Sequence, residues 1–189
     1  MKNKGLVIAL TVAVVTAGLA LSFPGQAHED HGHGDKQQKL HSGELVRVVR
    51  ETTRQYRDVN QAIAAGYHLM FGCVSGPDDG AMGLHYVNLE LVADGVLDPR
   101  RPEIVIYEPL PNGGRRLIGA DFLIFSEAWH AKNTGTPELG GQLMHLIDAP
   151  NRYGLPAFYT LHVWAWKPNP TGAFVNWHSD VSCEQFDAQ

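Results

Sequence analysis

The chain has 189 residues, of which 44% are hydrophobic and 19% are charged. This length allows one domain with a full core, and this composition excludes a disordered or fibrous protein. The formal net charge is −5 and there is no basic stripe, so we expect no nucleic-acid partner.

The N-terminus has the pattern of a secretory signal peptide over residues 1–27. Lys2 and Lys4 precede an apolar run from Leu6 to Leu21, and a tail of small and helix-breaking residues ends at Ala27. Cleavage there predicts an exported protein, periplasmic or secreted, with no stable membrane span after processing. The alternative is an uncleaved membrane anchor, although the apolar run is shorter than the ~20 residues that a spanning helix needs.

Residues 28–41 are polar and lack apolar periodicity, which predicts a disordered tail rich in histidine. Imidazoles and carboxylates in this tail suit loose binding of Zn²⁺ or Cu²⁺, and the alternative is a tail that only adds solubility. The residues concerned are His28, Glu29, Asp30, His31, His33, Asp35 and His41.

Residues 42–189 are predicted to form a single domain, which begins with an amphipathic helix from Ser42 to Ala65. A glycine-rich loop is expected from Gly72 to Gly83, without the ending of a phosphate-binding loop. Runs rich in β-branched residues from Glu103 to Leu110 and from Arg116 to Phe125 predict a hairpin, with Asn-Gly in the turn.

The last part of the chain predicts a short helix over Pro137–Asp148 and an aromatic strand over Phe158–Trp166. The order of helix, strand, hairpin, short helix and strand is typical of an α+β fold. We therefore expect a mainly antiparallel sheet that the N-terminal helix covers.

Three histidines lie in segments that are predicted to be ordered, and each follows an apolar or small residue. Three imidazoles with one open position make a zinc or copper site, and an added Glu108 or Glu127 would suit iron or manganese. No local ligand motif is present, so the three histidines would have to converge in space. The alternative is that each is a hydrogen-bonded structural residue of the core. The three are His85, His145 and His162.

Glu108 is the preferred fourth ligand because it shares the face of two isoleucines, where an acid needs a partner. Asn88 and Gln142 are candidates for orienting the ligands or a bound water. The sequence therefore favours a transition-metal protein, with zinc, copper or iron possible, and leaves open whether it is an enzyme. No serine elbow supports a nucleophilic hydrolase.

A second hypothesis uses the aromatic residues instead of the histidines. A non-catalytic envelope domain would bind a small molecule or a partner through an aromatic-lined strand, while the alternative for the same rings is core packing. The rings are Tyr159, Trp164, Trp166 and Trp177. Cys73 and Cys183 are the only cysteines, and an exported pair favours one disulfide over a redox or metal-ligand pair.

Four motifs span most of Gly72 to Glu184: GAMGLHYVN, LDPRRPEIVIYEP, GGQLMH and LHVWAWKPNPTGAFVNWHSDVSC. They resemble those of a family of bacterial exported proteins without an established activity. More distantly, His85-Tyr86 followed by IVIYE and RLIGADFLIFS is similar to the core of plant oil-body-associated proteins. The family resemblance implies a common fold and matches the histidines, Glu108, Asn88, Gln142 and both cysteines.

The chain departs from that family pattern at two places. His178 and Ser179 stand where the family has Asn-Pro, so His178 is not expected to be a ligand. Gly140 and Gly141 replace Phe-Gly before Gln142, which changes the approach to His145.

Overall fold

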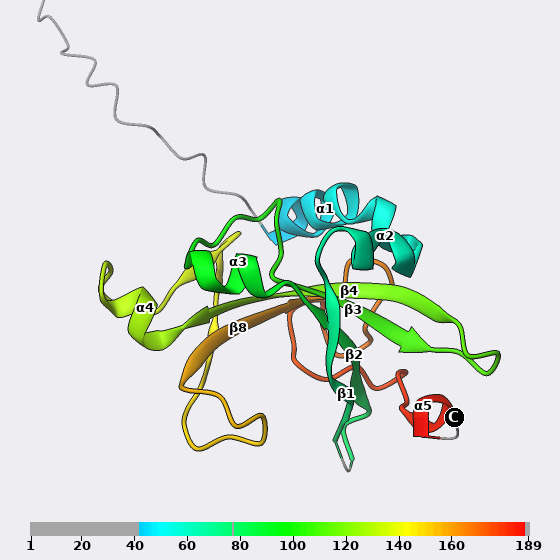
Figure 1. Cartoon of the computed structure of the whole chain (residues 1–189). Helices are drawn as coiled ribbons and strands as arrows, with labels where there is room; N and C mark the ends of the chain where they lie inside the picture. The colour runs from blue at the N-terminus through cyan, green and yellow to red at the C-terminus, as the bar shows by residue number, and fades with distance from the viewer. Residues whose placement is uncertain (1–41, 77, 188–189) are drawn as a thin grey trace, which may run out of the picture. The chain divides into compact units, whose positions relative to one another are not determined.

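A six-stranded sheet forms the centre of the fold, and all of its paired strands run antiparallel (Figure 1). In order across the sheet, the strands are β1 (His68–Ser75), β2 (Ala81–Val87), β3 (Ile104–Pro109), β4 (Arg115–Phe125), β8 (Phe158–Val163) and β7 (His145–Ile147). A separate pair joins β5 (Glu138–Leu139) to β6 (Gln142–Leu143). The predicted α+β class with a mainly antiparallel sheet is confirmed.

This computed structural model describes residues 42–76 and 78–187. The predicted signal peptide of residues 1–27 and the predicted tail of residues 28–41 lie outside the described residues. Within the described ranges, every helix is too short or too polar to cross a membrane.

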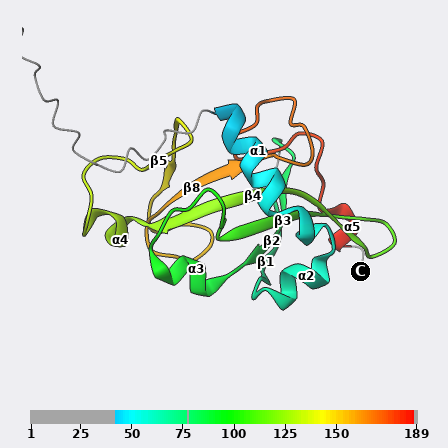
Figure 2. The same ribbon diagram turned by 90° about the horizontal axis from the view of Figure 1, so that it is seen from above.

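The helices that precede β1 and the helix between β2 and β3 lie on one face of the sheet (Figures 1 and 2). In chain order the helices are α1 (Ser42–Thr52), η1 (Arg54–Arg57), α2 (Val59–Ala64), α3 (Leu89–Asp94), α4 (Ser126–His130) and α5 (Glu184–Asp187). Leu45 and Val49 of α1 are buried in one core cluster with Phe122, Leu161 and Val163 of the central strands. The predicted covering helix is therefore present, and its apolar face is the one that packs on β4 and β8.

The predicted helix from Ser42 to Ala65 is wrong as a single element, because it is divided at two polar residues. Thr53 is fully buried, donates its hydroxyl to the carbonyl of Val49, and accepts a hydrogen bond from the indole of Trp166. Asp58 then accepts a hydrogen bond from the backbone N–H of Asn60 and so caps α2 as a new helix. Side-chain hydrogen bonds of this kind compete with a continuous helix.

Two further predictions of local structure need correction, and one is confirmed. The expected loop of residues 72–83 is mostly strand, since β1 and β2 pair with a bulge between Met70 and Cys73. The expected helix of residues 137–148 is instead β5, β6 and β7, because Gly140 and Gly141 take left-handed φ values of 60° and 76° and form a turn. The predicted hairpin is present as β3 and β4, with Gly113 at a φ of 73° in its turn.

Gly140 of this turn lies close against Leu45 of α1. A Cβ atom at Gly140 would lie 2.7 Å from Cβ of Leu45, whereas a Cβ at Gly135 would meet nothing within 4 Å. Both glycines have left-handed φ values, so an alanine at either position carries similar backbone strain. We expect Gly140→Ala to lower the free energy of unfolding by about 1–3 kcal/mol more than Gly135→Ala does. Urea unfolding of both variants measures the difference, and equal losses would contradict the packing argument.

The other face of the sheet is covered mainly by a non-helical segment. The segment that follows β8 returns beneath the sheet (Figure 1), and its residues Val181 and Cys183 are buried in one cluster with Ile104 and Phe158. A backbone bridge between Ala81 and His178 attaches this segment to β2. The predicted disulfide is present between Cys73 and Cys183, and it fixes the end of the segment to β1.

Candidate metal centre

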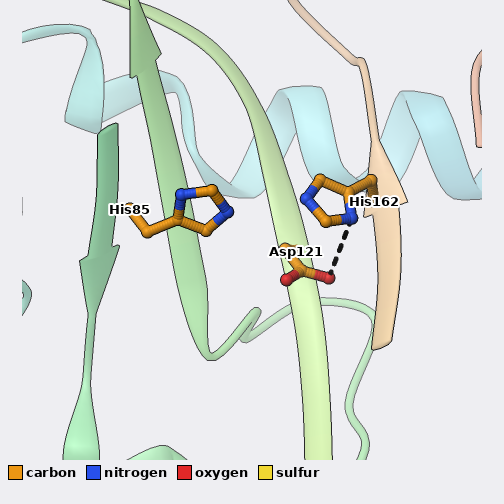
Figure 3. Close-up of side chains that lie close together, drawn as sticks. All are labelled: His85, Asp121 and His162. Carbon is orange, nitrogen blue, oxygen red and sulfur yellow. Dashed lines mark ion pairs between the residues drawn. The ribbon is translucent and has the colours of Figure 1, made fainter. Parts of the chain in front are cut away.

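Three side chains with metal-ligand chemistry converge on the face of the sheet that the helices do not cover. They are His85 on β2, Asp121 on β4 and His162 on β8, and one ligand atom from each lies within 4.8 Å of the others. In Figure 3 the two imidazole rings point toward each other, with the carboxyl group of Asp121 beside them. All three are buried. We call these three residues the buried cluster.

The strand register accounts for this convergence. Asp121 lies directly opposite His162 in the β4–β8 pair, and therefore on the same face. His85 lies opposite Ile106 on β3, which in turn lies opposite Gly119 on β4. His85 therefore shares the face with Asp121, because Gly119 and Asp121 are two residues apart on one strand.

His85 has one ring nitrogen in use and one available. Its Nδ1 lies 3.2 Å from the carbonyl oxygen of Gly83, which accepts a hydrogen bond when Nδ1 carries the proton. This tautomer leaves Nε2 as a lone-pair donor, the arrangement in which metal-binding histidines are commonly held. Burial, with a contribution from His162, lowers the pKa of His85 to about 4, so the ring is neutral at neutral pH.

His162 is 2% exposed, and neither of its ring nitrogens makes a hydrogen bond of normal geometry among the described residues, although the side chain of Asn176 is near enough to raise its pKa against the effect of burial. Its Nδ1 lies 3.6 Å from Oδ1 of Asp121, the contact that is dashed in Figure 3 and that is too long for a hydrogen bond. Burial lowers the pKa of His162 to about 3, so this contact is not an ion pair at neutral pH. A buried imidazole without partners costs free energy unless something else binds it.

Asp121 is held by two hydrogen bonds to one of its oxygens. Oδ1 accepts from the hydroxyl of Thr160 at 2.6 Å and from the backbone N–H of Leu161 at 3.1 Å. Among the described residues no hydrogen bond reaches Oδ2, which leaves that oxygen to bind a cation. Burial raises the pKa of Asp121 to about 6, although the Thr160 hydrogen bond opposes the rise.

A cavity of about 40 Å³ adjoins the buried cluster. The cluster supplies part of its wall, together with Thr160 and Asn176. The rest of the wall is apolar or aromatic: Phe71, Met82, Ile104, Leu123, Ile147, Tyr153, Leu155 and Phe158.

The structure brings together two of the predicted ligands and replaces the predicted acid. Glu108 is not in the buried cluster, because it is ion-paired with Lys167 at 2.7 Å and with Arg116. Burial alone would raise the pKa of Glu108, but these two cations hold it below its ordinary value. The sequence contained a signal for Asp121, since it is the only acid within the apolar run of β4. Glu108 was predicted as a ligand on the same kind of signal, an acid on an apolar face.

The remaining predicted site residues have other positions. His145 on β7 lies opposite Thr160 of β8 and is therefore on the same face as the buried cluster. It is exposed and lies outside the cluster. Asn88 caps α3 through the backbone N–H groups of Glu90 and Leu91. Gln142 donates to the hydroxyl of Ser42 and so links β6 to α1. Glu127 is exposed on α4.

The aromatic residues of the second hypothesis are largely engaged in packing. Trp164 is buried and donates its indole N–H to the carbonyl of Val175. Trp166 donates to Thr53, and the guanidinium groups of Arg50 and Arg57 lie 5.2 Å and 5.6 Å from the centroid of its ring. His178 is fully buried, and its Nδ1 accepts a hydrogen bond from the backbone N–H of Asp180.

Glu103, which precedes β3, is a buried acid outside the cluster. It is 1% exposed and accepts a hydrogen bond from the backbone N–H of Leu123 at 3.1 Å. Burial raises its pKa from 4.5 to about 8, so the folded protein keeps a proton that the unfolded chain releases. The stability that this proton provides is fully present below pH 4.5 and is lost as the pH rises through about 8.

We therefore expect the pH dependence of stability to change in Glu103→Gln. The wild-type protein should lose on the order of 3 kcal/mol of unfolding free energy relative to this variant between pH 5 and pH 8. Glu127→Gln, which removes an exposed carboxyl group, is the matched control. Urea unfolding across this pH range measures the effect, and parallel curves for the wild type and Glu103→Gln would contradict it.

No protein-family model, curated protein or solved structure matches this chain. The resemblance to a family of exported proteins therefore stays a prediction.

Proposed function

We propose that this chain is an exported protein that binds one divalent transition-metal ion through His85, Asp121 and His162. The observation that carries the proposal is the state of His162, whose two buried ring nitrogens make no hydrogen bond of normal geometry among the described residues and whose ring faces a carboxylate and a second imidazole. A bound cation would satisfy one of these nitrogens. It would also compensate the burial of the Asp121 carboxylate.

The donor set narrows the choice of metal. Two imidazoles and one carboxylate, with coordination positions left open, suit non-haem Fe(II), and three protein ligands of these types also occur in catalytic zinc sites. Mg²⁺ and Ca²⁺ prefer an all-oxygen set, so the two imidazoles count against them. The metal would supply Lewis acidity or a site for a ligand at its open positions.

The protonation states at neutral pH support binding. Both imidazoles are neutral, because burial keeps the pKa values of His85 and His162 at about 4 and about 3. The carboxyl group of Asp121, with a pKa of about 6, is mostly ionised above that pH. A metal would therefore displace few protons at neutral pH, and we expect binding to weaken as the pH falls below about 6.

The proposed export is supported by the disulfide between Cys73 and Cys183, since such bonds form and persist in oxidising compartments. Fractionation of the native host cells tests it. Recovery of the protein in the cytoplasmic fraction with both thiols reduced would contradict the proposal.

Elemental analysis of the full chain, purified without added metal, tests the metal site. We expect about one equivalent of a transition metal in the wild type and less than about a tenth in His162→Ala and Asp121→Ala. His145→Ala is the matched control, because it removes an exposed imidazole from the same face of the sheet.

Loose binding by the N-terminal histidines would confuse this measurement. A second control therefore replaces His28, His31, His33 and His41 with alanine and leaves the buried cluster intact. Metal that disappears in this control but persists in His162→Ala would assign the binding to the N-terminal segment and overturn the proposal. A wild-type protein that takes up no metal even after reconstitution would also overturn it.

A further inference from the structure

Asn176 presents an unused hydrogen-bond acceptor beside the buried cluster. It lines the cavity together with His85, Asp121 and His162. Its side-chain oxygen Oδ1 is buried and has no hydrogen-bond partner among the described residues. A buried carbonyl oxygen without a donor costs free energy, so an atom of this kind in a folded protein needs an explanation.

His162 has the complementary deficiency. A neutral imidazole carries a proton on one ring nitrogen and a lone pair on the other. When the lone pair binds a metal, the remaining N–H is usually donated to a carboxylate, a carbonyl oxygen or a water. Neither ring nitrogen of His162 makes a hydrogen bond of normal geometry among the described residues. The acceptor that His162 lacks and the donor that Asn176 lacks therefore lie on the wall of the same cavity.

The electrostatics of His162 support a contact between these two side chains. Burial lowers the pKa of His162 to about 3, and the side chain of Asn176 acts against this shift. An amide group that raises the pKa of an imidazole favours the protonated ring, which an amide oxygen does and an amide NH₂ group does not. Asn176 therefore lies near the ring and offers it an acceptor.

Other polar groups on the cavity wall already have partners. Oδ1 of Asp121 accepts from the hydroxyl of Thr160 and from a backbone N–H, and it lies 3.6 Å from Nδ1 of His162, beyond a normal hydrogen bond. The hydroxyl of Tyr153 donates to a methionine sulfur. Asn176 thus supplies the acceptor on this wall that has no donor of its own among the described residues.

The backbone on both sides of Asn176 is fixed by hydrogen bonds. The carbonyl of Val175 accepts from the indole of Trp164 at 2.7 Å, and the carbonyl of Trp177 accepts from the side chain of Asn169 at 2.8 Å. The backbone bridge to β2, two residues after Asn176, adds a third attachment. A side chain that orients a metal ligand has to be held in place itself, and this segment meets that requirement.

We propose that Asn176 is a positioning residue of the metal centre, whose side-chain oxygen accepts a hydrogen bond from one ring N–H of His162 and so directs the other ring nitrogen to the metal. His85 has the same arrangement, because its Nδ1 lies 3.2 Å from the carbonyl oxygen of Gly83. Each imidazole of the buried cluster then has a carbonyl oxygen for its proton and a lone pair for the metal. This inference rests on the proposed function and deepens it.

Nuclear magnetic resonance of the metal-free protein, with ¹⁵N in its histidine rings, tests the hydrogen bond at neutral pH. We expect a single tautomer of His162, with a ring N–H proton that the hydrogen bond shifts downfield. Asn176→Leu has the same branched shape without an acceptor and should lose this shift, whereas Asn176→Asp keeps an acceptor and should retain it. A wild-type ring that populates both tautomers overturns the proposal, so the test does not depend on how well a variant folds.

Metal affinity tests the consequence of the hydrogen bond. Competition with a chelator measures the dissociation constant of Zn²⁺, in the full chain without the four N-terminal histidines. We expect Asn176→Leu to weaken binding by about 10–100-fold and Asn176→Asp to restore most of it. Asn169→Leu is the matched control, because it removes a hydrogen bond of the same segment and leaves the acceptor in place. An equal loss in this control would make the role of Asn176 structural and overturn the proposal.

The outcomes separate this inference from the proposed function. A protein that binds no transition metal overturns the metal site, and the role of Asn176 with it. A protein that binds metal through His162 with equal affinity in the wild type and in Asn176→Leu overturns the positioning role alone. An unchanged N–H signal of His162 in Asn176→Leu, with an altered visible spectrum of bound Co²⁺, would make Asn176 a ligand itself and would also overturn that role.

Discussion

Saturating Zn²⁺ or Co²⁺ is expected to raise the melting temperature of the full chain by on the order of 10 °C, and His162→Ala is expected to remove that rise. A ligand that binds the folded state at a hundred to a thousand times its dissociation constant stabilises by about 3–4 kcal/mol. The ring nitrogens of His162 make no hydrogen bond of normal geometry among the described residues, so one of them is available to coordinate the metal.

Differential scanning calorimetry with and without a chelator measures this effect. The informative quantity is the difference between the two melting temperatures of each variant, because a loss of packing in His162→Ala affects both. His145→Ala should retain the rise, since His145 is exposed and outside the buried cluster. A chelator-independent melting temperature in the wild type would indicate that the cluster is a structural feature and would contradict the proposed site.

The sequence was sufficient to single out the two histidines of the buried cluster, although it also gave His145, and it did not single out Asp121. His85 and His162 stand out as polar residues in apolar or aromatic runs, and alternation assigns each to a face of its strand. Which side chains lie next to each other depends on the pairing of β4 with β8. The paired residues Asp121 and His162 are far apart in the chain. Local patterns carry no information about this register, and so Asp121 was missed.

The prediction of Glu108 as a metal ligand shows the same limitation of local sequence patterns. An acid on an apolar face was correctly expected to need a partner, but the sequence allowed a metal, a water or a basic side chain. The structure provides Arg116 from the adjacent strand and Lys167 from the segment after β8. Two cations satisfy Glu108 fully, whereas Asp121 has only hydrogen bonds and a neutral imidazole nearby.

The secondary structure was predicted correctly where one sequence pattern dominated. The prediction failed where contacts between distant residues determined the structure. The hairpin of β3 and β4 followed from its β-branched runs and its Asn-Gly turn. The interruption of the first helix depended on Trp166, which hydrogen-bonds Thr53 from more than a hundred residues away. The strands β5 to β7 depended on two glycines, which end a helical pattern by adopting left-handed φ values.

Removal of the disulfide is expected to have the second largest effect on stability. The bond joins residues separated by 110 positions, and a cross-link over a loop of this length is worth about 4–5 kcal/mol in the chain-entropy model. We expect Cys73→Ala/Cys183→Ala to lower the free energy of unfolding by about this amount. Alanine is preferred to serine because Cys183 is buried in an apolar cluster, where a hydroxyl group would add a penalty of its own.

Urea unfolding of the metal-free double variant measures this loss, and reduction of the wild type should reproduce it without affecting the variant. A loss below about 1 kcal/mol would contradict the prediction. The same variant also tests how the covering segment supports the metal site, because Asn176 lines the cavity and Cys183 anchors the segment that carries it. If that anchor holds the cover in place, the double variant should lose metal to a chelator faster than the wild type under conditions in which both remain folded.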